Sequence, residues 1–186
     1  MQQKSEYKVT VFHTQEKRIK IMTFPQPCTR DDAWLGEGYY FWKDETDAFD
    51  WGHNSKKRNG YFEVYTCDIN SDNYLDTVFN EKHYNFWIAQ LEKIAKKIAK
   101  KIMVKTHEKP TLKELNDYIR DKAIWPQVEY IQFQDLPTNS ERSLVKPIVY
   151  KQGKIRTVAF RKRIQICVYN PKIISNFALN DTVKVI

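Results

Sequence analysis

The segment from Trp34 to Gly52 gathers residue types that suit the binding of a flat ligand. It holds three of the five glycines and three of the five tryptophans of the 186-residue chain. Glycine lets another group approach the backbone closely, and aromatic rings can hold a planar ligand between them. The same composition also fits a glycine turn that leads into a strand whose aromatic side chains lie in the core. Composition alone leaves both interpretations open.

Histidine and cysteine are the other residue types here that could do chemistry. His13 and Thr14 come at the end of an alternating segment, 7–12, which predicts a half-buried strand. Taken alone, a histidine at a strand end is most often structural. His53, His83 and His107 lack the spacing of metal ligands, as do the three cysteines. We therefore expect no metal.

Three segments of the chain share a pattern. They are Phe12-His13-Thr14, the glycine-aromatic run Gly36-Glu37-Gly38-Tyr39-Tyr40-Phe41 followed by Ala48 and Trp51, and the late segment Arg163–Asn170. Together they resemble the ADP-ribosyltransferase superfamily, in the His-Tyr-Glu branch of the poly(ADP-ribose) polymerases and diphtheria toxin. The resemblance implies NAD+ as co-substrate and catalytic roles for His13, Tyr40 and Gln165. It also implies that NAD+ is contacted by His13, Thr14, Gly38, Tyr40, Ala48 and Trp51.

The chain departs from the family pattern at two positions. The glycine that usually follows the histidine is missing, so its backbone contact to the nicotinamide amide must come from Thr14 or from a shifted loop. The third catalytic residue is Gln165 where the family has a glutamate. Glu129, in a similar strand segment, is a rival for that place. We prefer Gln165 because the sequence after it continues as the family does.

The chemistry of the implied reaction fits these residue types. Breaking the bond between nicotinamide and ribose develops oxocarbenium character at the anomeric carbon. Tyr40 and Trp51 supply rings for the leaving group, and His13 supplies a ribose contact. Gln165 supplies a dipole beside the developing cation. Because an amide carries no full charge, we expect transfer of a single ADP-ribose unit rather than polymer growth.

Hydrophobic periodicity predicts the elements that position these residues. Strands are predicted over 7–12 and 61–69, an amphipathic helix from Glu81 to about Lys105, and a shorter helix from the capping box Thr111–Glu114 to about Lys122. Further strands are predicted over 128–133, 147–150, 155–160 and 164–169. The fold class is α+β, and the resemblance implies a split antiparallel β-sheet core of ADP-ribosyltransferase type with a central helical segment. We expect a single domain, 1–186, with a frayed C-terminal end.

The net charge of +8 is concentrated in two segments. Residues 93–105 and 151–163 each hold six basic residues and no acidic one, so the rest of the chain is net acidic. Such clusters suit a partner that carries phosphates, although lysine-rich faces are also commonly just solvated. The candidate nucleic-acid contacts are Lys93, Lys97, Lys100, Arg161 and Arg163.

We therefore expect an NAD-dependent mono-ADP-ribosyltransferase whose acceptor is RNA or DNA in preference to protein. Family habit suggests a toxin of a toxin–antitoxin or phage-defence system, with an antitoxin protein as partner. The alternatives are a non-catalytic nucleic-acid-binding domain, a metal-independent ribonuclease toxin, and hydrolysis of NAD+ without an acceptor. The sequence shows no membrane span and no signal peptide, so a cytoplasmic protein with no membrane partner is expected.

Overall fold

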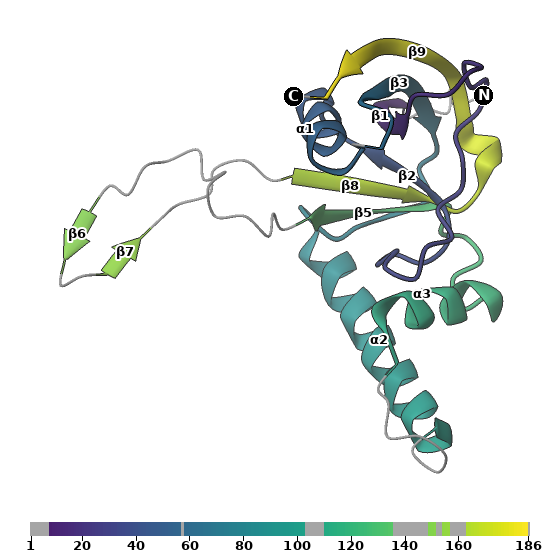
Figure 1. Cartoon of the computed structure of the whole chain (residues 1–186). Coiled ribbons are helices and arrows are strands. Elements are labelled where there is room, and N and C mark those ends of the chain that lie inside the picture. The colour runs from purple at the N-terminus through teal and green to yellow at the C-terminus, as the bar shows by residue number, and fades with distance from the viewer. Residues whose placement is uncertain are drawn as a thin grey trace, which may run out of the picture.

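Seven strands of the computed structural model form one sheet in the order β4-β5-β8-β2-β1-β3-β9 (Figure 1). The structure describes residues 8–56, 58–102, 110–135, 149–151, 154–156 and 163–185. The strands of the sheet are β1 (Lys8–Glu16), β2 (Tyr39–Trp42), β3 (Tyr61–Asn70), β4 (Tyr74–Asp76), β5 (Tyr130–Asp135), β8 (Arg163–Val168) and β9 (Ile174–Lys184). Two further strands, β6 (Val149–Lys151) and β7 (Lys154–Arg156), pair with each other. The described helices are α1 (Glu45–Ser55), α2 (Glu81–Ile102), α3 (Leu112–Asp121) and a short 3-10 helix, Pro171–Ile173.

The pairing between β1 and β2 is the shortest in the sheet, and we call it the narrow joint. These strands pair only where Phe12 lies opposite Trp42, whereas β1 pairs with β3 along its whole length. All neighbours are antiparallel except β4 and β5, which are parallel. The α+β class is confirmed. The seven strands form one mostly antiparallel sheet, with β4-β5-β8-β2 on one side of the narrow joint and β1-β3-β9 on the other.

The two predicted helices form for the reasons that the sequence indicates. In α2, Leu91 and Ile94 are buried while Lys93 and Lys97 are exposed, as its periodicity predicted. In α3, Thr111 and Glu114 form the predicted capping box, each side chain accepting from the other residue's backbone N–H. The two helices pack together and α2 contacts β4, so they cover the same part of the sheet (Figure 1).

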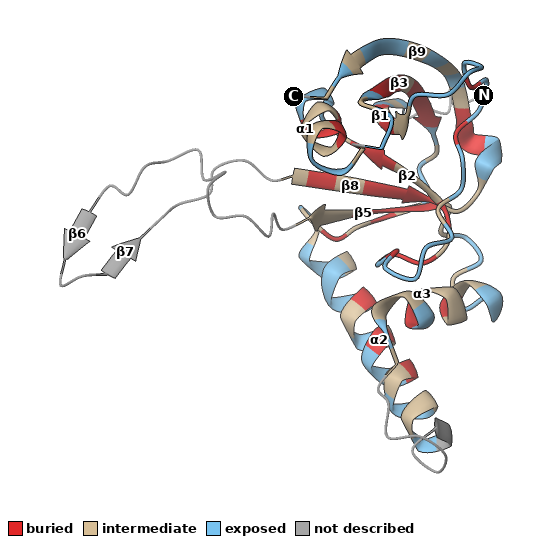
Figure 2. Cartoon of the chain, viewed as in Figure 1, coloured by how far each residue is buried: buried red, intermediate tan, exposed pale blue. Residues whose placement is uncertain are grey.

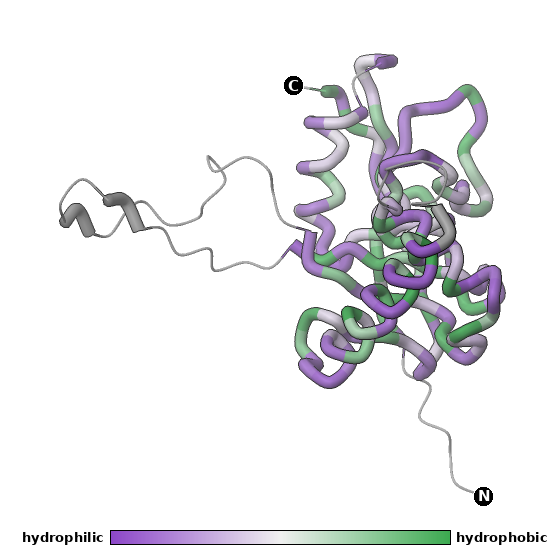
Figure 3. Tube along the Cα trace, turned by 90° about the horizontal axis from the view of Figure 1, so that it is seen from below, coloured by the Kyte–Doolittle hydropathy of each residue, from purple (hydrophilic) through white to green (hydrophobic). Residues whose placement is uncertain are grey.

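Three apolar clusters hold the layers together. One lies on the inner strands around Val11, Phe41 and Ile166, and a second joins α2 and α3 to the sheet through Trp87 and Leu115. The third fixes α1 over β1, β2 and β3. Figure 2 shows β8 largely buried and β9 mostly intermediate or exposed. Hydrophobic and hydrophilic stretches alternate along the trace, as such half-buried elements require (Figure 3).

Several expectations about the elements need correction. The expected frayed end is wrong, because residues 174–184 form β9, an edge strand that pairs with β3. Stacking of Phe177 on Tyr65, with ring centroids 4.7 Å apart, anchors it. β1 runs on to Glu16, so His13 and Thr14 lie inside the strand rather than at its end. The sequence analysis also missed α1, whose N-cap Asp44 accepts from the Thr46 N–H. Of the strands predicted over 147–150 and 155–160, residues 147–148 and 157–160 lie outside the described residues.

Candidate active site

A cavity of about 640 Å³ opens beside the narrow joint between β1 and β2. Its walls come from β1, the segment 26–34, β2, α1 and the adjoining ends of β5 and β8. Five of the seven residues predicted for catalysis or NAD+ contact line it, and they come from four separate segments: His13, Thr14, Tyr40, Trp51 and Gln165. The fold therefore brings the candidate site together.

His13 is buried with one ring nitrogen bonded and the other without a partner. Its Nδ1 lies 2.9 Å from the carbonyl oxygen of Tyr40. Because a carbonyl can only accept, Nδ1 carries the proton in the neutral ring. Burial, with smaller contributions from Lys56 and Arg18, lowers the pKa of His13 to about 4, so the ring is neutral at pH 7. Nε2 is then a buried acceptor with no partner among the described residues.

The hydroxyl of Tyr40 is turned back into the protein. It donates to the Gly36 carbonyl at 2.8 Å and accepts from the Leu35 N–H at 3.0 Å. Burial raises the pKa of Tyr40 well above its ordinary value, which removes the hydroxyl as a base near neutral pH. Tyr40 therefore contributes to the cavity through its place in the wall and through the carbonyl that orients His13.

Thr14 and Ala48 connect β1 to α1. The Thr14 hydroxyl donates to the Ala48 carbonyl at 2.8 Å. Ala48 is fully buried and does not line the cavity, so the structure places it behind the wall. A larger side chain would displace α1 and with it Trp51, because cores are closely packed.

Two tryptophans and an ion pair form the aromatic side of the cavity. Trp51 packs against Trp42 with ring centroids 5.7 Å apart. The Arg163 guanidinium lies 4.7 Å from the centre of the Trp42 ring, and its Nε donates to Asp135 at 2.9 Å. Asp135 therefore balances the charge of Arg163, which faces the cavity instead of an open surface.

Each of the three glycines of this segment has a packing reason. A Cβ on Gly38 would lie 2.5 Å from the Cys167 sulfur and 2.9 Å from the Val168 oxygen. The close approach predicted here is therefore made by β8, and Gly38 does not line the cavity. Gly36 has φ +86°, a left-handed backbone conformation that favours glycine. A Cβ on Gly52 would overlap the Phe62 ring.

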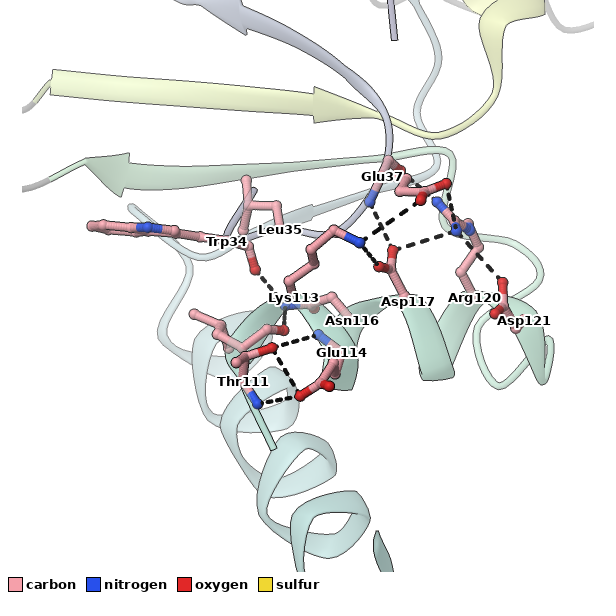
Figure 4. A network of polar contacts seen from close by, with 12 residues as sticks. Trp34, Leu35, Glu37, Thr111, Lys113, Glu114, Asn116, Asp117, Arg120 and Asp121 are labelled. Atoms are coloured by element: carbon pink, nitrogen blue, oxygen red, sulfur yellow. Dashed lines mark hydrogen bonds and ion pairs between the residues drawn. The ribbon is translucent and has the colours of Figure 1, made fainter. Parts of the chain in front are cut away.

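A polar network on α3 holds the turn before β2 (Figure 4). Asp117 accepts from the Glu37 N–H at 2.7 Å, and Asn116 donates to the Trp34 carbonyl at 3.0 Å. Asn116 also accepts from the Trp87 indole at 3.1 Å. These side chains position a wall of the cavity from 80 residues away in sequence, and no local pattern indicated them.

Gln165 and Glu129, the two candidates for the third catalytic residue, lie near opposite ends of β5. Gln165 pairs with Phe133 and Trp42 and lines the cavity. Glu129 lies beyond the other end of β5, where it does not line the cavity. Its carboxylate accepts from Asn170 at 2.6 Å and also from Ser71 and Asn73. Burial raises the pKa of Glu129, but these hydrogen bonds outweigh burial and lower it. Glu129 therefore joins the turn after β3 to the end of β8.

Sequence reasoning missed the cations of the cavity. Arg18, Arg30 and Lys56 line it together with the predicted residues. Arg30 pairs with Asp32 at 2.9 Å. Burial, and next the neighbouring Arg30, lowers the pKa of Lys56. Arg18 and Lys56 do lie in short basic runs, 17–20 and 56–58, whereas Arg30 is followed by two aspartates. Candidate phosphate contacts were predicted only in the two larger clusters, 93–105 and 151–163.

The predicted nucleic-acid contacts do not gather at the cavity. Lys93, Lys97 and Lys100 are exposed on α2 and do not line it, whereas Arg163 does. Arg161 lies outside the described residues. No group of side chains that could hold a metal ion occurs within the described part of the chain. None of the helices in that part is long and apolar enough to cross a membrane.

Comparisons of the chain with protein-family models, with curated proteins and with solved structures find no match.

Proposed function

We propose that the protein transfers a single ADP-ribose unit from NAD+ to a macromolecular acceptor, with RNA or DNA favoured over protein. The observation that carries the proposal is the meeting of His13, Trp51 and Gln165 at one cavity. The cavity, of about 640 Å³, falls within the ~300–1,000 Å³ typical of small-molecule sites. The narrow joint at Phe12–Trp42 supports a core of the split type.

The unpartnered Nε2 of His13 suits a ribose hydroxyl. A neutral imidazole whose Nδ1 donates to the Tyr40 carbonyl offers Nε2 as an acceptor. A sugar hydroxyl is a donor that would satisfy it, and a buried polar atom left without a partner is costly. His13 would therefore orient the ribose without exchanging a proton.

Trp51 and Gln165 would act on the two sides of the bond that breaks. The electrons of the bond between C1′ and the pyridinium nitrogen leave with nicotinamide, which becomes neutral. Trp51 would hold that ring, and the amide oxygen of Gln165 would face the positive charge that develops at C1′. The acceptor atom then bonds to C1′ and its proton passes to solvent. An amide dipole stabilises this charge less than a carboxylate does, which favours one transfer over repeated transfer.

The pKa values of His13 and Tyr40 argue against a ribonuclease that uses these two residues as its acid and base. Such an enzyme needs a general acid or base that titrates near the working pH. Burial lowers the pKa of His13 to about 4 and raises that of Tyr40, so neither group exchanges protons readily at pH 7. The roles of toxin and of antitoxin partner stay proposals that rest on the family resemblance.

Labelled NAD+ tests this function. The protein is incubated with NAD+ labelled in the adenylate phosphate together with RNA, DNA or protein, and nicotinamide release is followed in parallel. We expect label on RNA or DNA and equimolar nicotinamide. Binding of nucleic acid with no nicotinamide release would favour the non-catalytic alternative, and shortened unlabelled RNA would favour a ribonuclease. Release without label in any pool would indicate NAD+ hydrolysis.

A further inference from the structure

A second hollow adjoins the cavity and has a different chemical character. Lys17–Phe24, Gln26 and Asn59 line this outer hollow, which measures about 670 Å³. Among the described residues, its lining has three cations and no acidic side chain, whereas the lining of the cavity has both signs. Arg18 and Gln26 line both spaces, so the outer hollow lies next to the cavity.

The loop that forms the outer hollow is held firmly while its tip faces solvent. The Lys17 N–H donates to the Tyr61 carbonyl at 3.1 Å, and the Met22 N–H donates to the Tyr65 hydroxyl at 3.2 Å. Between these anchors Ile19 is fully exposed and Ile21 is 61% exposed. Three large apolar side chains thus lie exposed among cations within one short loop, with Phe24 as the third.

We propose that the outer hollow binds single-stranded nucleic acid and delivers the acceptor nucleotide to the cavity; the delivery step rests on the proposed function. Lys17, Arg18 and Lys20 suit backbone phosphates. Phe24, 40% exposed and held edge-on to Tyr39 at 5.7 Å, offers a ring to an unpaired base. Cations interleaved with apolar side chains match a strand in which phosphates alternate with flat bases. The basic segment 93–100 of α2 contains no aromatic residue and does not line the cavity.

A pair of charge-matched variants tests the location. Binding of a labelled ten-nucleotide single strand, as RNA and as DNA of the same sequence, is measured by fluorescence anisotropy. Lys17→Gln with Lys20→Gln is compared with Lys93→Gln with Lys97→Gln, which removes the same charge from α2. Each phosphate contact to a single strand contributes about 0.7 to the salt slope. We therefore expect the first variant to lower the slope by about 1.4 and the affinity roughly 25-fold at 0.1 M salt, and the second to change neither.

Phe24→Ala tests the stacking contact separately from charge. A base stacked on an aromatic ring contributes about 1–3 kcal/mol, so we expect at least about fivefold weaker binding with an unchanged salt slope. Melting temperatures of all variants are measured first. If Phe24→Ala unfolds the loop, Phe24→Leu serves instead, because it keeps the apolar packing and removes the ring.

Several results would overturn the inference. They are an equal or larger loss in the α2 variant, no binding of either strand by the unaltered protein, and equally tight, Lys17- and Lys20-dependent binding of polyglutamate or of vesicles with one quarter phosphatidylserine. Calorimetry with NAD+ separates this outcome from the proposed function. Strand binding through the outer hollow without any NAD+ binding would support the nucleic-acid site and contradict the transferase function. Normal modification of nucleic acid by the Lys17 and Lys20 variant would support the transferase function and contradict a nucleic-acid site in the outer hollow.

Discussion

The polar groups of the cavity and those around Glu129 differ in how completely they are hydrogen-bonded. Glu129 accepts from three side chains, and Asn116 on α3 bonds to two backbone carbonyls and an indole. In the cavity, His13 Nε2 has no partner among the described residues. Buried polar atoms in a folded protein are normally satisfied. Glu129 and Asn116 therefore stabilise the chain, whereas His13 Nε2 in the cavity remains an acceptor without a hydrogen bond among the described residues.

Removing the unpartnered histidine should have the largest effect. We expect His13→Ala to abolish nicotinamide release, because the ribose loses its orienting contact, while the melting temperature stays close to that of the unaltered protein. Tyr40→Ala should also abolish it, through loss of the wall and of the His13 orientation. Nicotinamide is quantified by chromatography and the fold is checked by circular dichroism. Turnover retained in the well-folded double variant would remove the enzyme assignment.

Gln165 and Glu129 should show opposite effects on activity and stability. Losing one dipole that acts in the transition state typically lowers the rate about 10²–10³-fold, so Gln165→Ala should be slow but stable. Glu129→Ala should keep its activity and lose about 1–3 kcal/mol of unfolding free energy, because Ser71 and Asn170 lose their acceptor. Gln165→Glu should remain active with an altered rate. A dead Glu129→Ala beside a normal Gln165→Ala would show that the strand assignment is wrong.

The buried neutral histidine should make stability depend on pH. The unfolded chain binds a proton at His13 near pH 6.5, whereas the folded protein binds it only near pH 4. Stability from this group is complete above pH 6.5 and falls as the pH drops, by about 2–3 kcal/mol at pH 4.5. Urea unfolding at pH 7 and pH 4.5 measures this loss. The His13→Gln variant has no titrating group at this position, so its unfolding free energy should fall less between pH 7 and pH 4.5 by that amount. Equal losses in the two proteins would contradict the burial of a neutral ring.

We expect the smallest effect on NAD+ binding at Gly38, because its backbone packs against β8 and does not line the cavity. The Cβ of Gly38→Ala would press on the Cys167 sulfur and the Val168 oxygen. We expect a loss of about 1–3 kcal/mol of unfolding free energy, as overpacking usually costs. The NAD+ affinity of the folded fraction should be unchanged. A variant that is stable but binds NAD+ weakly would instead indicate that a ligand approaches this backbone.

The secondary structure could be predicted wherever one face of an element is apolar. The face of α2 that carries Leu91 and Ile94 and the alternation at the start of β1 stand out in the sequence because burial imposes a 3.6- or 2-residue period. β9 was missed because its asparagines and aspartate suggest a turn. As an edge strand, β9 needs only one buried face, and its pairing with β3 supplies the backbone hydrogen bonds.

The sequence by itself determined the α+β class, the capping box of α3 and the residue types of the candidate site, because these depend on neighbours along the chain. Only the tertiary structure showed that Gln165 lines the cavity and Glu129 does not, since both lie in strand-like segments and the pairing register alone places them. It likewise turned the Tyr40 hydroxyl inward and placed Arg18 and Lys56 beside His13. The pairing of β2 with β8 and the proximity of Lys56 to His13 join residues that are far apart along the chain, so no local pattern could contain them.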